Sequence, residues 1–242
     1  MPRFDVLVVY KKSQLELALE KHNTRIKRLL KRGDPSVRAM RLAHDAHKAT
    51  LDAVARALDD AGASFRHVYR ARLRRSAAAK ASLVVSVGGD GTLLDASHKL
   101  VDTPALGVNS DPAHSVGFLC ASDATTFAGH LARVMTDGAW SPTDVRRLSG
   151  AVDDVKLPFP VLNDVLVAHK NPAATSRYFL EHRGTVEDHK SSGIWIATAA
   201  GSTAALSAAG GAVFDIDDAR AQLVVREPFE ADRERYALSA FV

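Results

Sequence analysis

Residues 83–100, LVVSVGGDGTLLDASHKL, form the stretch that decides the fold of this chain. An apolar run over Leu83–Val87 is typical of a buried strand, and it leads directly into Gly88-Gly89-Asp90-Gly91-Thr92. A helical pattern then resumes over Leu93–Leu100. Asp-Gly is also a common hairpin pair, but the helical segment after it argues against a hairpin here. Strand, glycine turn and helix in this order predict a parallel sheet with helices on its faces.

The segments around this stretch repeat the alternation of strand and helix. Short apolar runs predict further buried strands at Val6–Val9, Phe65–Tyr69 and Ala105–Val108. Between the first two, Asp34-Pro35 predicts the start of a long helix and Gly62 its end. We therefore predict a Rossmann-like α/β domain over residues 1–110.

The pattern changes after residue 110. One helix is expected near Ala124–Met135, and the other segments are short, strand-like and separated by turn residues. Expected strands are Val161–Ala168, Arg177–Glu181, Ile194–Thr198 and Gln222–Val225. Residues 111–242 are therefore predicted to form a β-rich, β-sandwich-like domain.

Composition excludes several classes of protein. The chain has 242 residues, a formal net charge of +4 and 6% aromatic residues. No aromatics interleave with the basic stretches Lys21–Arg32 and Arg70–Arg75, so these predict solvated helix faces and no nucleic-acid partner. No run reaches the roughly 18 apolar residues of a membrane span. Because the N-terminus opens straight into a strand without a signal-peptide pattern, we expect a cytoplasmic protein.

Other residues that could suggest chemistry have simpler explanations. A lone Cys120 excludes an intramolecular disulfide, and we interpret it as a small buried hydrophobe. His44 and His47 lie three apart on the long predicted helix without an evident third ligand, so we expect helix-surface histidines. The acidic run Asp215–Asp218 lacks a calcium-loop pattern and predicts a solvated turn.

The glycine turn carries the chemistry. Ligands of an open parallel sheet bind just beyond the carboxyl ends of its strands. Glycines let the backbone approach a phosphate closely, and the N-terminus of the helix offers free N–H donors to an anion. A carboxylate at Asp90 would repel a phosphate unless it takes a proton from an attacking hydroxyl or holds a metal. The motif therefore indicates phosphoryl transfer and leaves the substrate open.

The same motif resembles a signature shared by NAD kinases, diacylglycerol and sphingosine kinases, and phosphofructokinases. The segments further along the chain are similar to the NAD kinase family alone. In that family's order they are Gly107–Pro112 with Gly117–Cys120, Leu162–Val165 and Gly193–Gly211, flanked by Val6–Lys11 and Val225–Pro228. The resemblance thus covers almost the whole chain.

This resemblance implies an ATP-dependent kinase that phosphorylates the adenosine ribose 2′-hydroxyl of NAD or NADH, with magnesium and as a homodimer or homotetramer. Asp90 would be the catalytic base. The implied binding residues are Gly88, Gly89, Gly91 and Thr92 at the phosphates, Asn163 and Asp164 at the acceptor ribose, Lys190 and Ser192 near the nicotinamide, and Ser202, Thr203, Ala204, Ala205 and Ser207 along the adenosine. No residue is expected to ligate the metal, which phosphates and water would hold. From the residues alone, Ser202 or Thr203 could instead cap a helix through Ala209.

Some positions depart from the family's common form. Its Pro-Thr and Tyr are Ala199-Ala200 and Ala205 here, and its Arg-x-Asp is Lys190-Ser191-Ser192. These variants resemble the plant and mitochondrial branch, the NADH kinase-like members. Neutral Ser192 beside Lys190 predicts a neutral to positive field, which favours NADH at least as well as NAD.

Two other functions are compatible with these motifs. A lipid kinase would share the glycine motif, and a nucleotide sensor without turnover would keep the adenosine contacts. Asp90 argues against the sensor. The chain stops at Val242, about where we expect further strands, which argues for the sensor and would fit either a short member or a truncated sequence.

Overall fold

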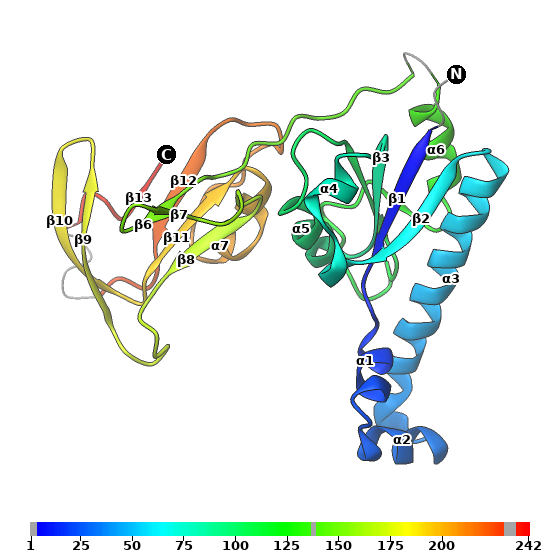
Figure 1. Ribbon diagram of the computed structural model, residues 1–242. Coiled ribbons are helices and arrows are strands. Elements are labelled where there is room, and N and C mark those ends of the chain that lie inside the picture. The colour runs from blue at the N-terminus through cyan, green and yellow to red at the C-terminus, as the bar shows by residue number, and fades with distance from the viewer. Residues whose placement is uncertain (1–3, 137–138, 230–235) are drawn as a thin grey trace. The chain divides into compact units, whose positions relative to one another are not determined.

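The computed structural model describes residues 4–136, 139–229 and 236–242 (Figure 1). Two compact units make up the chain, Met1–Pro142 and Thr143–Val242. The domain boundary that we predicted at residue 110 differs from this division. Strand β5 (Ser122–Asp123) pairs with β4 through Val108 and Ser122, and helix α6 packs into the same core, so both belong to the first unit. A two-residue strand has no period by which a sequence could reveal it.

The first unit is a five-stranded parallel sheet with strand order β2-β1-β3-β4-β5. This is a doubly wound order, so the predicted α/β domain is confirmed. The other strands are β1 (Asp5–Tyr10), β2 (Ser64–Tyr69), β3 (Leu83–Gly88) and β4 (Ala105–Asn109). The helices are α1 (Gln14–Glu20), α2 (Thr24–Lys31), η1 (Pro35–Val37), α3 (Arg38–Asp60), η2 (Arg70–Arg72), α4 (Arg75–Ala78), α5 (Asp90–Ser97) and α6 (Phe127–Val134).

Helices cover both faces of this sheet because its central strands are apolar on both sides. Val6 and Val8 of β1 face a core that α3 and α6 complete, whereas Leu7 and Val9 face a second core that α4 and α5 complete. Strand β3 is buried at every position. Burial of this kind is the main favourable contribution to folding, at about 25 cal/mol per Å² of apolar surface.

The long helix begins as predicted, after a short 3₁₀ turn. The Asp34 carboxylate accepts the Ser36 N–H at 2.9 Å, and the chain turns after α3 at Gly62, with φ +67°. The prediction of surface histidines is wrong for His47, which is 1% exposed and contacts the Lys11 carbonyl through Nε2 at 2.8 Å. Burial lowers the pKa of His47. It lies on the face of α3 that packs against the segment after β1. The spacing of His44 and His47 within one turn of helix does not show which of them faces that segment.

The second unit is rich in antiparallel strands, as predicted. Its four-stranded sheet has the order β13-β12-β11-β8, and a separate hairpin joins β9 to β10. The strands are β6 (Ala151–Val152), β7 (Val155–Lys156), β8 (Asp164–Val167), β9 (Ser176–His182), β10 (Thr185–Ser191), β11 (Ile194–Thr198), β12 (Ala221–Val225) and β13 (Ala240–Phe241), with short helices η3 (Ala200–Thr203) and α7 (Ala205–Ala208) after β11.

A separate apolar cluster packs on each face of the four-stranded sheet. Leu180 of the hairpin packs with Ile194 and Leu223 on one face. On the other, Leu206 of α7 packs with Ala197 and Val224. Within the described ranges, no helix is both long enough and apolar enough to cross a membrane.

Candidate active site

The glycine turn joins β3 to α5 through close backbone approaches. A Cβ atom on Gly88 would lie 2.1 Å from Thr92 Oγ1, and one on Gly89 would lie 2.9 Å from Ser115 Oγ. Only hydrogen fits at Gly88, where the first turn of α5 folds back on the end of β3. Gly91 has open space around its Cα, so packing does not explain this third glycine.

Asp90 is the first residue of α5, three residues before the helix start that we predicted. Its carboxylate accepts two backbone N–H groups, from Leu119 at 2.7 Å and from Phe118 at 2.9 Å. Such charge-assisted bonds fix the plane of the carboxylate. Each oxygen still has a lone pair to accept a further proton or hydrogen bond.

Gly117 makes this arrangement possible. Its φ is +61°, and a Cβ there would lie 2.4 Å from Asn109 Nδ2. The Asn109 amide in turn donates to the Ser115 carbonyl at 2.9 Å, which closes the loop between β4 and Phe118. The Gly117–Cys120 segment, which resembles the NAD kinase family, therefore has a local physical task. It brings two N–H groups to Asp90.

Two further residues of the first unit surround the turn. Burial and the nearby Asp90 charge raise the pKa of Cys120 to about 11, so the thiol stays protonated and is not a nucleophile. Arg70 Nη1 donates to the Gly91 carbonyl at 3.3 Å and pairs with Asp95 at 3.0 Å. We predicted a solvated helix face for Arg70, because no local signal reveals its contact with a helix that begins twenty residues later.

In the second unit, the turn after β11 lies on the backbone before β8. A Cβ on Gly201 would lie 2.1 Å from the Asn163 carbonyl oxygen, which also accepts the Thr198 N–H at 3.0 Å. Asn163 Nδ2 donates to Asp164 Oδ2 at 2.8 Å, and burial raises the pKa of Asp164. The structure thus brings Asn163 and Asp164 beside the Gly201 turn, although these motifs are far apart in sequence.

Ser202 forms part of the interior of the Gly201 turn. It is fully buried, and its hydroxyl donates to the Ala199 carbonyl at 2.6 Å and accepts the Phe214 N–H at 2.9 Å. Both bonds hold the turn together. Neither Ser202 nor Thr203 caps a helix, because α7 covers only Ala205–Ala208. The partly exposed members of the predicted set are Thr203, Ala204, Ala205 and Ser207.

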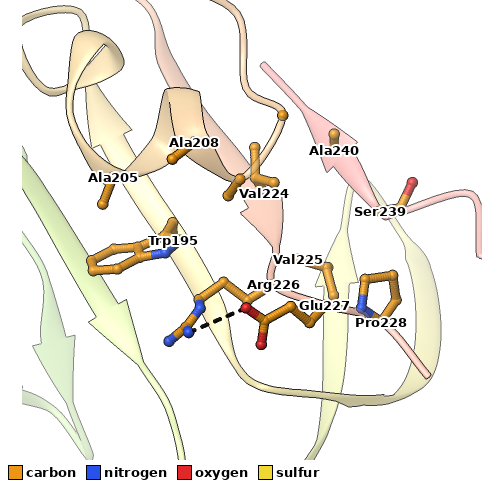
Figure 2. Close-up of a pocket in the computed structure, with 12 residues that line it drawn as sticks. Trp195, Ala205, Ala208, Val224, Val225, Arg226, Glu227, Pro228, Ser239 and Ala240 are labelled. Atoms are coloured by element: carbon orange, nitrogen blue, oxygen red, sulfur yellow. Dashed lines mark hydrogen bonds and ion pairs between the residues drawn. The ribbon is translucent and has the colours of Figure 1, made fainter. Parts of the chain in front are cut away.

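A pocket of about 780 Å³ opens beside α7 (Figure 2). Small residues of α7, Ala205 and Ala208, form one side, and Trp195 of β11 forms an aromatic wall. The Arg226 guanidinium lies 5.9 Å from the centre of the Trp195 ring and 3.5 Å from the Glu227 carboxylate. An aromatic face, a cation and small apolar neighbours suit a flat heteroaromatic ring.

The sequence pattern does not indicate a role for the charged pair Arg226 and Glu227 at this pocket. The Ser192 N–H donates to the Arg226 carbonyl at 3.0 Å, and the Ser192 hydroxyl and the Arg226 charge lower the pKa of Glu227. A carboxylate therefore contacts Ser192, and its ion pair with Arg226 adds no net charge to the predicted neutral to positive surroundings. Lys190 uses its N–H toward the Tyr236 hydroxyl at 3.3 Å, and its ammonium lies 6.0 Å from the Phe229 ring.

A family model for the ATP-NAD kinase N-terminal domain matches residues 7–139, which is more than half of the chain. The chain belongs to the NAD kinase family. Its match includes the glycine turn, Asp90 and the Gly117–Cys120 segment, and it ends three residues before the boundary of the first unit.

Two of the relatives of this chain are NADH kinases from plants. A probable NADH kinase of Oryza sativa subsp. japonica is 41% identical over 168 residues, which cover 60% of this chain and 51% of that protein. An NADH kinase of Arabidopsis thaliana is 41% identical over 187 residues, with 60% and 53% covered. The chain thus spans about half the length of the curated relatives that it matches.

Solved NAD kinases share the fold. The enzyme of Archaeoglobus fulgidus, in complex with ATP, superposes with a TM-score of 0.62 at 22% identity, over 93% of this chain and 73% of that one. The yeast NADH kinase, complexed with NADH, has a TM-score of 0.64 at 14% identity, over 100% and 66%. Low identity limits this likeness to the architecture.

Proposed function

We propose that this protein transfers the terminal phosphoryl group of ATP to the adenosine ribose 2′-hydroxyl of NAD or NADH, giving NADP or NADPH. Membership of the NAD kinase family and the plant relatives named NADH kinases support the reaction class. Solved members of the same fold carry ATP in one case and NADH in another. The family match covers the glycine motif, which leaves the lipid-kinase alternative without support.

The observation that carries the proposal is the placement of Asp90. A carboxylate held by two backbone N–H groups stands at the first turn of α5, where the free N–H groups of the helix attract a phosphate. The ribose 2′-oxygen bonds to the terminal phosphorus of ATP while Asp90 takes the proton of the 2′-hydroxyl. The bond between this phosphorus and ADP breaks, and ADP leaves. The transition state is loose, so most of the rate comes from alignment and charge neutralisation, with the base acting late.

The second unit supplies the acceptor contacts. Asn163 presents an amide that can both donate to and accept from ribose hydroxyls, and Asp164, bonded to it, fixes its orientation. Thr203, Ala204, Ala205 and Ser207 line the adenosine side of this region. The pocket at Trp195 offers a face on which a ring of the dinucleotide can stack (Figure 2).

NADH is accepted at least as well as NAD. The electrostatic reason that the sequence suggested needs revision, because Glu227 contacts Ser192. Its ion pair with Arg226 carries no net charge, so the surroundings give the positive nicotinamide of NAD little advantage over the neutral ring of NADH. If the specificity constant for NAD is ten or more times that for NADH, this part of the proposal is wrong.

Magnesium enters as part of the nucleotide substrate. Across the described ranges, no three His, Cys, Asp or Glu side chains gather as a metal site. The triphosphate and water would hold the ion, as is usual for magnesium. Assembly as a homodimer or homotetramer is part of the same proposal, and light scattering of the purified protein would test it.

One assay tests the reaction. Purified protein is incubated with magnesium and ATP, with NAD and NADH supplied separately, and 2′-phosphorylated product is quantified by chromatography. We expect product from both acceptors. Nucleotide binding without product would assign the protein to the sensor class, and the same assay with polyphosphate in place of ATP identifies the donor.

A further inference from the structure

The carboxyl edge of the parallel sheet has a switch point between β1 and β3. The chain passes from β1 to β2 on one side and then returns to place β3 on the other. Ligands of doubly wound sheets bind outside the carboxyl ends of the strands at such a point. Gly88–Asp90 occupies the β3 side of this point. Lys11, the first residue after β1, occupies the other.

The strand register places Lys11 next to the glycine turn. Tyr10 pairs with Val87, so the next residue along each strand brings Lys11 beside Gly88, at the usual strand separation of about 4.8 Å. Leu7 and Val9 point to the side of the sheet that α5 covers. Side chains alternate along a strand, and continued alternation directs Lys11 to the same side.

Lys11 differs from its neighbour Lys12 in its ion pairing. Among the described residues, no carboxylate forms an ion pair with it, whereas adjacent Lys12 pairs with Glu20 and lies 5.1 Å from the Tyr69 ring. His47 holds the Lys11 carbonyl. The charges of Lys11 and Asp90 both reach the Cys120 thiol, with opposite effects on its pKa, so the two lie in one electrostatic neighbourhood.

Two buried hydroxyls at this edge also lack partners. Thr92 Oγ1 and Ser110 Oγ belong to residues that are 1% exposed, and neither makes a hydrogen bond within the described part of the chain. Thr92 packs on Gly88, and the Ser110 N–H donates to the Gly88 carbonyl at 2.7 Å. Buried polar groups are rarely left unpaired, and these two indicate a place for water or for ligand oxygens.

We propose that Lys11 binds the phosphates of the donor nucleotide, opposite the Gly88–Asp90 turn. This proposal rests on the proposed phosphoryl transfer. The lysine ammonium is a compact charge with three N–H donors, a common partner of phosphate. As the terminal phosphoryl leaves, negative charge collects on ADP, and a cation at this position stabilises it. Lys11 therefore acts in donor binding and in the transfer step.

Substitution of the two adjacent lysines tests this assignment. Lys11→Met removes the charge and keeps the apolar stem, Lys11→Arg keeps the charge, and Lys12→Met is the matched control. ATP with magnesium is titrated calorimetrically into each variant without acceptor. We expect Lys11→Met to weaken ATP binding about 10- to 100-fold, as for loss of a charged hydrogen bond. Lys11→Arg should recover much of this loss, and Lys12→Met should bind within about twofold of wild type.

Steady-state kinetics and thermal melting complete the test. Lys11→Met should raise the KM for ATP and lower kcat, while the KM for the dinucleotide stays near wild type and the melting temperature is unchanged. Equal ATP affinity of Lys11→Met and wild type overturns the proposal. An equal loss of ATP affinity in Lys12→Met, or wild-type protein that binds no ATP, overturns it as well. Wild-type protein that binds ATP but forms no phosphorylated dinucleotide defeats the proposed function alone, and the titration then still decides the role of Lys11. If Lys11→Met does not fold, the ATP affinities of Lys11→Arg and Lys11→Gln are compared instead. Equal affinities of these two variants would then overturn the proposal.

Discussion

The glycine turn of the first unit and the Gly201 turn of the second differ in how far the structure follows the sequence motif. In the first, Gly88, Asp90 and Thr92 occupy one continuous strand, turn and helix, as their spacing predicts. In the second, Ser202 is buried in internal bonds, while Trp195 and Glu227 line a pocket that the motif did not indicate. A motif locates a site more completely when its residues are consecutive in one element.

The reason lies in the hydrogen bonds of each region. Thr92 reaches Gly88 because the first turn of α5 folds back on the end of β3, so the contact is between residues close in sequence. Ser192 reaches Glu227 only because β11 pairs with β12 in one particular register. Both residues lie just outside these paired strands, so a shift of the register would move them apart along the chain.

The largest effect is expected from Asp90→Asn, which tests the local turn. Loss of a general base should lower turnover about 10²–10⁴-fold, while the dinucleotide still binds. Stopped assays and calorimetry measure the two quantities. Asp95→Asn, on the same helix, is the control and should retain most activity. Turnover above about a third of wild type in Asp90→Asn would remove this residue as the base.

Gly201→Ala tests the contact between the Gly201 turn and the backbone of Asn163, which is distant in sequence. The new Cβ meets the Asn163 carbonyl at 2.1 Å, and backbone cannot move aside as a side chain can. Overpacking of this kind should reduce the free energy of unfolding by about 1–3 kcal/mol. The control, Gly129→Ala in α6, has open space and should stabilise by roughly 0.5–1 kcal/mol. Urea denaturation measures both, and an unchanged midpoint for Gly201→Ala would contradict the contact.

Asn163→Ala should weaken dinucleotide affinity more than ATP affinity. A lost hydrogen bond to a bound ribose costs about 1–2 kcal/mol, or roughly 5- to 30-fold in the dissociation constant. Calorimetric titration of NADH and of ATP compares the two ligands. Asn171→Ala alters only an exposed loop turn and serves as the control. Unchanged NADH affinity in Asn163→Ala would remove Asn163 from the site.

The smallest effect concerns the acceptor preference. Glu227→Gln removes the carboxylate beside Ser192 and leaves Arg226 unpaired, so the ratio of specificity constants should move toward NADH. Charges about 4 Å apart in water interact by roughly 1 kcal/mol, which predicts a change of several-fold. Ser192→Asp adds a carboxylate and should move the ratio toward NAD. If both variants move the ratio in the same direction, this electrostatic explanation is wrong.

The sequence alone determined the architecture of both units and the family. Apolar runs near residues 6, 65, 83 and 105 located four of the five parallel strands, and glycine content located the turn that carries Asp90. It also indicated Ile194–Thr198 and its antiparallel partners. These features depend on periods of two to four residues and on glycine conformations, which a short stretch of sequence contains in full.

Only the tertiary structure decided which groups meet at the site. The N–H groups of Phe118 and Leu119 that orient Asp90, and the carboxylate of Glu227 at Ser192, come from segments 28 or more residues away. The burial of Ser202 depends on a bond to Phe214 across a loop. Contacts of this kind follow from sheet register and from the closure of long loops, and neither leaves a pattern in the neighbouring residues.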